Sequence, residues 1–268
     1  MAILQLTSRE NALFKTIRLI SSGSRRAPAD LVVAEGIRVL REIDTCGCRI
    51  DTVLLSEGFG NSNKEEELLH GWLARNVRIC RTSESLFRTV SDVRAPQGAI
   101  ALVPFPERKL AAAVPGQNAL VLFACGIQDP GNLGTIIRTA AAAGASLVCI
   151  GPKTVSPRNP KAIRASAGTI FRIPIVEHAE MSEFLDYCTR HSIRAYRTDI
   201  LQGLAYTHVD FRSPSAILLG NEGNGIPYEE CIGLPAIRIP MAEDIESLNV
   251  AMAGAVILFE ASRQRTKG

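Results

Sequence analysis

Short apolar runs alternate with amphipathic stretches along the chain, which is the pattern of an α/β protein. In the first hundred residues, apolar runs predict strands at 31–34, 53–55, 77–80 and 99–103. Apolar residues at helical spacing predict helices around 11–20, 37–43, 65–74 and 84–90. We therefore expect a compact α/β module in this half of the chain.

Proline, glycine and charged residues interrupt this alternation between residues 104 and 118. Such a cluster of turn-forming residues is typical of a connection between domains. The predicted organisation is therefore a first domain at 1–103, a linker at 104–118 and a second domain at 119–268.

The second half begins with a continuous apolar run at 119–125, which is typical of a strand buried on both faces of a parallel sheet. Similar runs follow at 147–150, 194–196, 216–219 and 236–239. Helical segments separate them, so a mostly parallel sheet is expected. A final helix at about 248–263 is rich in small residues and apolar on most faces, which predicts burial on more than one side, in part against a second subunit.

Composition adds limits on compartment and chemistry. The chain has 268 residues, of which 46% are hydrophobic, enough for a substantial core in two domains. Several of its cysteines fall inside apolar runs, which indicates a reducing compartment. Cys46 and Cys48 form a C-x-C pair without a second ligand cluster, so no metal is expected.

No apolar run approaches the ~20 residues of a membrane span, and the N-terminus lacks the long apolar core of a signal peptide. We expect a cytoplasmic protein.

The net charge of +3 is unevenly distributed. Residues 1–110 hold 16 Lys and Arg against 13 Asp and Glu, whereas the remainder is balanced at 14 against 14. Within the first 26 residues, only Glu10 opposes five basic residues, Arg9, Lys15, Arg18, Arg25 and Arg26. This excess fits contact with a polyanion, and it fits a solvated basic face equally well.

Three segments place Gly, Asn or Pro at the ends of strand-like runs, where open α/β sheets bind ligands. They lie at 129–140, 219–225 and 239–250, and we expect them to form one site. In the first, Asp129 precedes a helix on which Gly134 and Arg138 share a face. This is a candidate phosphate or ribose clamp, and a capped helix with a surface ion pair is the alternative.

The second segment, Gly220-Asn221-Glu222-Gly223-Asn224-Gly225, does not match the glycine order of a dinucleotide fingerprint. No acidic residue ends a following strand at the right distance to hold a ribose, and the chain lacks the Gly-Lys-Ser/Thr of a P-loop. What remains is a glycine loop that approaches a ligand through main-chain groups, or simply a tight turn. In the third segment, Ser247 is the expected helix N-cap, with Asn249 in the first turn. The alternative is that Ser247 and Asn249 are capping residues with no role in ligand binding.

The three segments together resemble the motifs of the SpoU (TrmH-like) branch of the SPOUT RNA methyltransferases. The matching residues are Asn132, Gly134, Arg138 and Ala140; Gly220, Glu222, Gly223 and Gly225; and Ile239, Pro240, Met241, Ser247, Leu248, Asn249 and Val250. In the first half, Asn11, Lys15, Glu35-Gly36-x-Arg38 and Pro96-Gln97-Gly98 are similar to the RNA substrate-binding module often fused to these enzymes.

This resemblance implies methylation of a ribose 2′-hydroxyl in RNA, with S-adenosyl-L-methionine as the methyl donor. It implies a small N-terminal α/β RNA-binding domain, a C-terminal SPOUT domain with a deep trefoil knot, and a homodimer in which the arginine of one subunit serves the other's pocket. The implied cofactor-binding residues are Gly220, Ile239 and Leu248, with Leu219, Met241 and Asn249 beside them. The implied catalytic residues are Arg138, Asn132, Glu222, Ser247 and Asn249. The implied RNA-binding residues are Asn11, Lys15, Arg25, Arg26, Arg38 and Gln97.

Arg138 is expected to be essential for transfer. Guanidinium groups are poor bases, so orienting a phosphate and stabilising charge on the 2′-oxygen is the easier role for it, and the identity of the general base stays open. The substrate-binding module favours ribosomal RNA of the large subunit, with transfer RNA as the alternative. A non-catalytic ribosomal RNA binding or assembly factor is a second alternative. A small-molecule enzyme that uses a nucleotide cofactor is disfavoured because the phosphate-loop signatures are missing.

Overall fold

The computed structural model describes residues 3–221, 225–227, 229 and 231–266. It divides into two compact units. The first contains residues 1–106 and 158–171, and the second contains residues 107–157 and 172–268. The segment 158–171 thus groups with the N-terminal unit, although the sequence assigns it to the range 119–268. The domain boundaries expected from the sequence stay a prediction.

The first unit is built on a five-stranded sheet with the order β1-β4-β3-β5-β2. Its strands are β1 (Leu4–Leu6), β2 (Leu31–Glu35), β3 (Thr52–Ser56), β4 (Arg78–Thr82) and β5 (Ala99–Pro104). The strands β1, β4 and β3 run parallel, whereas β5 is antiparallel to both of its neighbours. The four longer strands confirm the predicted ones, and β1 was not predicted because three residues give no periodicity.

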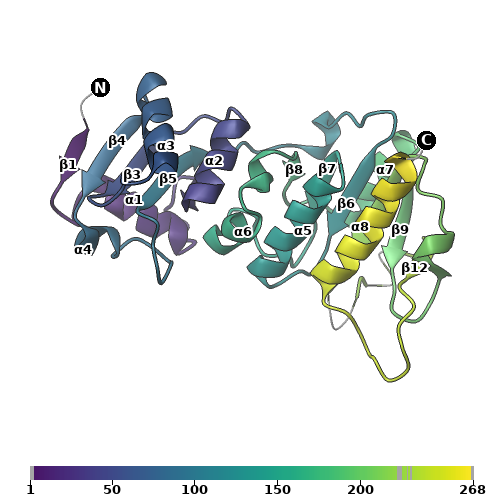
Figure 1. Ribbon diagram of the computed structural model, residues 1–268. Helices are drawn as coiled ribbons and strands as arrows, with labels where there is room; N and C mark the ends of the chain where they lie inside the picture. Colours follow the sequence, from purple (N-terminus) through teal and green to yellow (C-terminus); the bar gives the residue numbers. More distant parts are fainter. Residues whose placement is uncertain (1–2, 222–224, 228, 230, 267–268) are drawn as a thin grey trace. The chain divides into compact units, whose positions relative to one another are not determined.

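Helices surround this sheet (Figure 1). They are α1 (Ala12–Ser21), α2 (Ile37–Thr45), α3 (Asn63–Ala74), α4 (Glu84–Phe87) and α6 (Pro160–Ala165), with a 3-10 turn η2 at Thr169–Phe171. The helix α1 shows how the sequence determines them. Asn11 caps its start by accepting a hydrogen bond from Leu13 N (2.9 Å), and Phe14 and Ile17 lie one turn apart in the core.

The segment 158–171 is anchored in the first unit by several contacts. The Arg158 guanidinium donates to the carbonyl oxygen of Ala29 and lies 4.9 Å from the centroid of the Phe105 ring. Phe105 also packs edge-to-face on Phe171, with ring centroids 6.0 Å apart. At Gly168, a Cβ would lie 2.7 Å from Glu42 Cβ, so only glycine fits against α2. The first unit is therefore completed by residues that follow the second sheet's first two strands in the chain.

The second unit has a seven-stranded sheet with the order β10-β12-β9-β11-β6-β7-β8. Its strands are β6 (Leu120–Ala124), β7 (Leu147–Ile150), β8 (Ile175–Val176), β9 (Arg194–Thr198), β10 (Leu204–Ala205), β11 (Ser215–Leu219) and β12 (Ala236–Arg238). Every described pairing is parallel, which confirms the predicted parallel sheet. The two-residue strands β8 and β10 were not predicted.

Helices cover both faces of this sheet. The helices are α5 (Pro130–Ala142), α7 (Met181–Arg190) and α8 (Val250–Thr266), with 3-10 turns η1 at Leu110–Ala112 and η3 at Tyr206–His208. On one face α7 packs through Phe184 against Phe123 of β6, with ring centroids 4.6 Å apart. On the other face α5 and α8 lie side by side, and Gly254 of α8 lets that helix approach Leu219 of β11 (Figure 1). The central strands are therefore buried on both faces, as their continuous apolar runs predict.

The deep knot implied by the resemblance stays a prediction. Among the described residues, no helix has the length and apolar character that a membrane span requires.

Candidate active site

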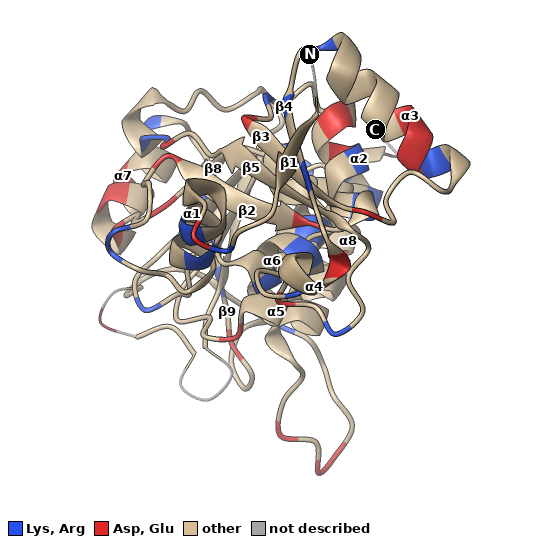
Figure 2. Ribbon diagram, turned by 90° about the vertical axis from the view of Figure 1, so that its left-hand side faces the viewer, with Lys and Arg blue, Asp and Glu red and all other residues tan. Residues whose placement is uncertain are grey.

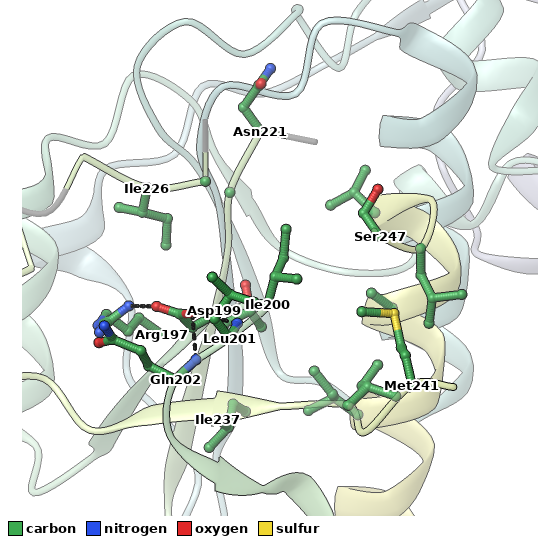
Figure 3. A pocket seen from close by; sticks show the side chains of 18 of the residues that line it. Arg197, Asp199, Ile200, Leu201, Gln202, Asn221, Ile226, Ile237, Met241 and Ser247 are labelled. Atoms are coloured by element: carbon green, nitrogen blue, oxygen red, sulfur yellow. Dashed lines mark hydrogen bonds and ion pairs between the residues drawn. The ribbon is translucent and has the colours of Figure 1, made fainter. Parts of the chain in front are cut away.

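The carboxyl ends of three neighbouring parallel strands surround one cavity of about 800 Å³. The strand β9 lies between β11 and β12, and Leu218 pairs with Arg197 while Ile237 pairs with Thr198. The loops that leave these strands therefore begin side by side. The segment 246–248 and the first turns of α8 complete the lining, and Met241 and Ser247 lie across the cavity from Arg197 and Gln202 (Figure 3).

The cavity lining is mainly apolar. Its larger apolar side chains are Ile200, Leu201, Ile226, Ile237, Ile239, Met241, Leu248, Val250 and Ile257. The charged residues beside them are Arg197, Asp199 and Glu246. Its size and its mixture of apolar walls with a few polar groups are those of small-molecule and cofactor sites.

The glycine loop after β11 closes tightly on itself. Asn221 and Gly225 exchange two backbone hydrogen bonds of 3.1 and 2.9 Å, and Gly225 has a φ of +63°. A Cβ on Gly220 would lie 2.4 Å from the carbonyl carbon of Gly225, so only glycine fits there. Asn221 Nδ2 donates to the carbonyl oxygen of Gly126 (2.9 Å), which ties the loop to the end of β6. Gly220, Asn221 and Gly225 thus pack closely together and form part of the cavity wall. The predicted residue Glu222 lies outside the described residues.

The third segment supplies Ile239, Met241, Ser247 and Leu248 to the cavity lining. The prediction of Ser247 as helix N-cap is wrong, and so is the placement of Asn249 in the first turn. The helix begins at Val250, and Asn249 Oδ1 accepts hydrogen bonds from Ala251 N (2.9 Å) and Met252 N (3.3 Å). Asn249 precedes the helix directly, so its amide oxygen reaches the free N–H groups and leaves Ser247 to the cavity wall.

The first segment meets the third through two asparagines. Asn249 Nδ2 donates to Asn132 Oδ1 over 3.1 Å, which links the starts of α5 and α8. Asp129 caps α5, as predicted, by accepting from Asn132 N (2.9 Å). Arg138 is exposed on α5 and is not among the residues that line the cavity. The second and third segments therefore share the cavity, while the first joins them at its edge.

Leu219 and Asn249, which are also predicted to bind the cofactor, are not among the residues that line the cavity. The side chain of Asn249 caps α8 and bonds to Asn132, as described above. Leu219 lies in a different place. Its side chain is buried beneath α8 against Gly254, while Gly220, the next residue, lines the cavity.

Sequence reasoning missed the loop after β9, which contributes residues 199–202 to the cavity. Asp199 is the polar centre of this loop, because Arg197 and the N–H groups of Leu201 and Gln202 all bond to its carboxylate. Burial alone would raise the pKa of Asp199, but these hydrogen bonds outweigh it and hold that pKa below its usual value. The sequence signal that could have identified this loop is the polar pair Thr198-Asp199, which follows the predicted strand at 194–196.

The predicted RNA-binding residues lie in the first unit with different surroundings. Arg25, Arg26 and Arg38 are exposed, and Lys15 forms an exposed ion pair with Glu10 at 3.0 Å. Asn11 caps α1, as described above, and Gln97 Oε1 accepts from Ile37 N (2.9 Å) at the start of α2. Figure 2 shows basic residues on α1, in contrast to the run of acidic residues on α3.

Within the part of the chain that the structure describes, no cluster of three His, Cys, Asp or Glu side chains could hold a metal ion. The expectation of a metal-free site stays a prediction.

Comparisons with known proteins cover both halves of the chain. Residues 119–259 match the model of the SpoU rRNA Methylase family, and residues 11–101 match that of the MRM3-like substrate binding domain. A 23S rRNA (guanosine(2553)-2′-O)-methyltransferase of Bacillus subtilis is 29% identical over 95% of this chain and 98% of its own length.

Solved structures show the same similarity. An AdoMet-bound rRNA methyltransferase from Sinorhizobium meliloti superposes with a TM-score of 0.86 at 28% identity, over 97% of this chain and 98% of that one. A structure described as an RNA 2′-O ribose methyltransferase gives a TM-score of 0.82 at 32% identity, over 98% and 100% of the two chains.

We predict that Gly220→Ala destabilises the second unit, because the new methyl group would overlap the backbone of Gly225. The expected loss is about 1–3 kcal/mol, or roughly 2–4 °C in Tm for each kcal/mol. Thermal unfolding followed by circular dichroism measures it. Gly116→Ala is the control, since a Cβ there meets no atom within 4 Å. Equal Tm values for the two variants would contradict the tight closure of the loop.

Proposed function

Because the chain belongs to the SpoU rRNA Methylase family, we propose that it transfers a methyl group from S-adenosylmethionine to a ribose 2′-hydroxyl of large-subunit ribosomal RNA. The observation that carries this proposal is the cavity at the ends of β9, β11 and β12, because residues of the second and third family motifs line it. The rRNA methyltransferase from Sinorhizobium meliloti that resembles this chain over nearly its whole length is described as AdoMet-bound.

The cavity residues fit such a methyl donor. Apolar walls suit a flat adenine ring, and strand ends at Gly220 and Ile239 offer main-chain donors and acceptors. The tight closure at Gly220 keeps side-chain atoms out of this wall. Leu248 would contribute in the same way from the segment before α8. When bound, S-adenosylmethionine supplies an electrophilic methyl group on a sulfonium.

Arg138 has the main role towards RNA in this proposal. An exposed guanidinium can hold a phosphate in two hydrogen bonds and stabilise negative charge developing on the 2′-oxygen. The hydrogen bond between Asn132 and Asn249 fixes the start of α5 beside the start of α8, and so sets the position of the helix that carries Arg138. Since Arg138 does not line the cavity of its own chain, we propose that it serves the cavity of a second subunit.

The helix α8 offers a surface for such a second subunit. Met252, Val256 and Phe259 recur at helical spacing on one face and are 51%, 37% and 51% exposed. A row of large exposed apolar side chains is typical of a protein interface. We therefore propose a homodimer through α8.

The first unit would bind the RNA. Its match to a substrate-binding domain and its exposed Arg25, Arg26 and Arg38 support contacts to the phosphate backbone. Lys15, Asn11 and Gln97 would belong to the same surface. The relatives named above favour ribosomal RNA over transfer RNA. The cytoplasmic location and the absence of a metal stay predictions.

We predict that Arg138→Ala lowers methyl transfer at least about 100-fold and leaves S-adenosylmethionine binding within a few-fold of wild type, since the arginine acts on the RNA. Labelled methyl transfer to ribosomal RNA and isothermal titration calorimetry measure the two effects. Arg190→Ala, at an exposed arginine of α7, is the control. Near-normal turnover of Arg138→Ala would exclude this role. A wild-type protein that binds ribosomal RNA but neither binds nor uses S-adenosylmethionine would instead be a binding or assembly factor.

Replacing Arg25 and Arg26 together with Ala should weaken RNA binding, because two phosphate contacts are lost. The slope of log K against log salt should fall by about 1–2. Filter binding at several salt concentrations measures this slope. Lys64→Ala removes an exposed charge from the acidic helix α3 and should leave the slope unchanged. A similar slope for all three proteins would rule out the proposed contacts.

Val256→Asp should convert the dimer into monomers, because it places a charge in the centre of the apolar face of α8. Sedimentation equilibrium measures the mass, and circular dichroism checks the fold. Val114→Asp, at a side chain that is 89% exposed, is the matched control and should remain dimeric. A dimeric Val256→Asp variant would place the interface elsewhere.

A further inference from the structure

One carboxylate organises the loop that follows β9. Asp199 Oδ1 accepts hydrogen bonds from Leu201 N (2.9 Å) and Gln202 N (2.8 Å), while Oδ2 pairs with the guanidinium of Arg197. The side chain of Asp199 is 21% exposed and that of Arg197 only 12%. Both carboxylate oxygens are therefore engaged within the loop itself.

Both ends of the loop are tied to β12. Asp199 N donates to the carbonyl oxygen of Ile237 over 2.9 Å. At the other end, Gly203 has a φ of +100°, and a Cβ there would lie 2.2 Å from the carbonyl oxygen of Ala236. Arg238 Nε also donates to the carbonyl oxygen of Gly203 (3.3 Å). With its ends held in this way, the loop depends on Asp199 for the shape of its interior.

This shape presents two large apolar side chains at the cavity. Ile200 and Leu201 line it while remaining 44% and 84% exposed, on the side opposite Met241 and Ser247 (Figure 3). Without the carboxylate, two N–H groups would lose this acceptor and the Arg197 guanidinium would lose this ion pair. Burial of Ile200 and Leu201 would then favour collapse of the loop into the cavity.

The position of Asp199 is similar to that of a ribose-binding carboxylate in other folds. In dinucleotide-binding folds an acidic side chain near the end of a strand beside the glycine loop binds ribose hydroxyls. Here Asp199 directly follows β9, next to β11, but its carboxylate already accepts three hydrogen bonds within its own loop.

We propose that Asp199 is a positioning residue: together with Arg197 it holds loop 199–203 in the shape that forms one wall of the methyl-donor cavity, and it does not bind the ribose itself. This inference rests on the function proposed above, in which the cavity binds S-adenosylmethionine. It explains why a carboxylate lies in a largely apolar cavity.

The test compares Asp199→Asn, Arg197→Gln and the double variant. Binding of S-adenosylhomocysteine is measured by calorimetry, and transfer kinetics give KM and kcat. Each single variant should raise the Kd for S-adenosylhomocysteine and the KM for S-adenosylmethionine about 10-fold, as expected for about 1–2 kcal/mol lost from loop positioning. The kcat at saturation should stay within about twofold. The double variant should lose no more than either single one, because the two side chains act as one unit.

Two further variants separate positioning from general destabilisation. Arg197→Lys keeps the positive charge and should recover part of the affinity that Arg197→Gln loses. Asp210→Asn breaks an ion pair with Arg212 that has the same two-residue spacing but is exposed and outside this cavity, so the Kd should not change.

Three results would overturn the inference. Unchanged affinity in the Asp199 and Arg197 variants would show that the pair does not shape the cavity. Additive losses in the double variant would show that the two side chains act independently and not as one unit. Failure of the wild-type protein to bind S-adenosylhomocysteine would refute the proposed function and this inference with it, and is seen before any variant is compared.

Discussion

The parallel pairing of β9, β11 and β12 is the constraint on which the candidate site depends. Because parallel strands point their carboxyl ends to the same edge of the sheet, the loops beginning at Asp199, Gly220 and Ile239 must lie together, although other elements separate them in the chain. A shift in this pairing would separate all three loops at once. Burial of the central strands on both faces holds the pairing in place, and Gly254 allows α8 to close over β11 and complete the cavity.

The starts of α5 and α8 are the second feature that organises the candidate site. The capping residues Asp129 and Asn249 lie at the beginnings of α5 and α8, and the bond from Asn249 to Asn132 makes the two starts one structure. Asn249 therefore stabilises a helix and connects two motifs with the same side chain. The proposed division of roles follows from this arrangement: the strand ends hold the methyl donor, whereas α5 carries Arg138 towards RNA and α8 presents an apolar face to a second subunit.

Much of this could be predicted from the sequence, for physical reasons that differ between elements. The strand at 120–124 was predictable because burial on both faces requires an uninterrupted apolar run, and Gly220 because only glycine allows such a tight loop. The role of Asp199 could not be predicted, because the N–H groups that bond to its carboxylate are brought there only by the folded shape of its own loop. Ser247 was mistaken for the N-cap because the start of a helix can be predicted from sequence only to within a few residues. The grouping of 158–171 with the first unit depends on contacts such as Arg158 with Phe105, which no local pattern encodes.

The position of the transferred methyl group tests the central claim most directly. Ribosomal RNA would be incubated with the protein and S-adenosylmethionine labelled in its methyl group, then hydrolysed with alkali and separated by nucleotide size. A methyl group on a 2′-oxygen blocks the attack of that oxygen on the neighbouring phosphodiester. We therefore expect the label in alkali-resistant dinucleotides. Label recovered in mononucleotides, with the methyl group on a base, would contradict the reaction proposed here.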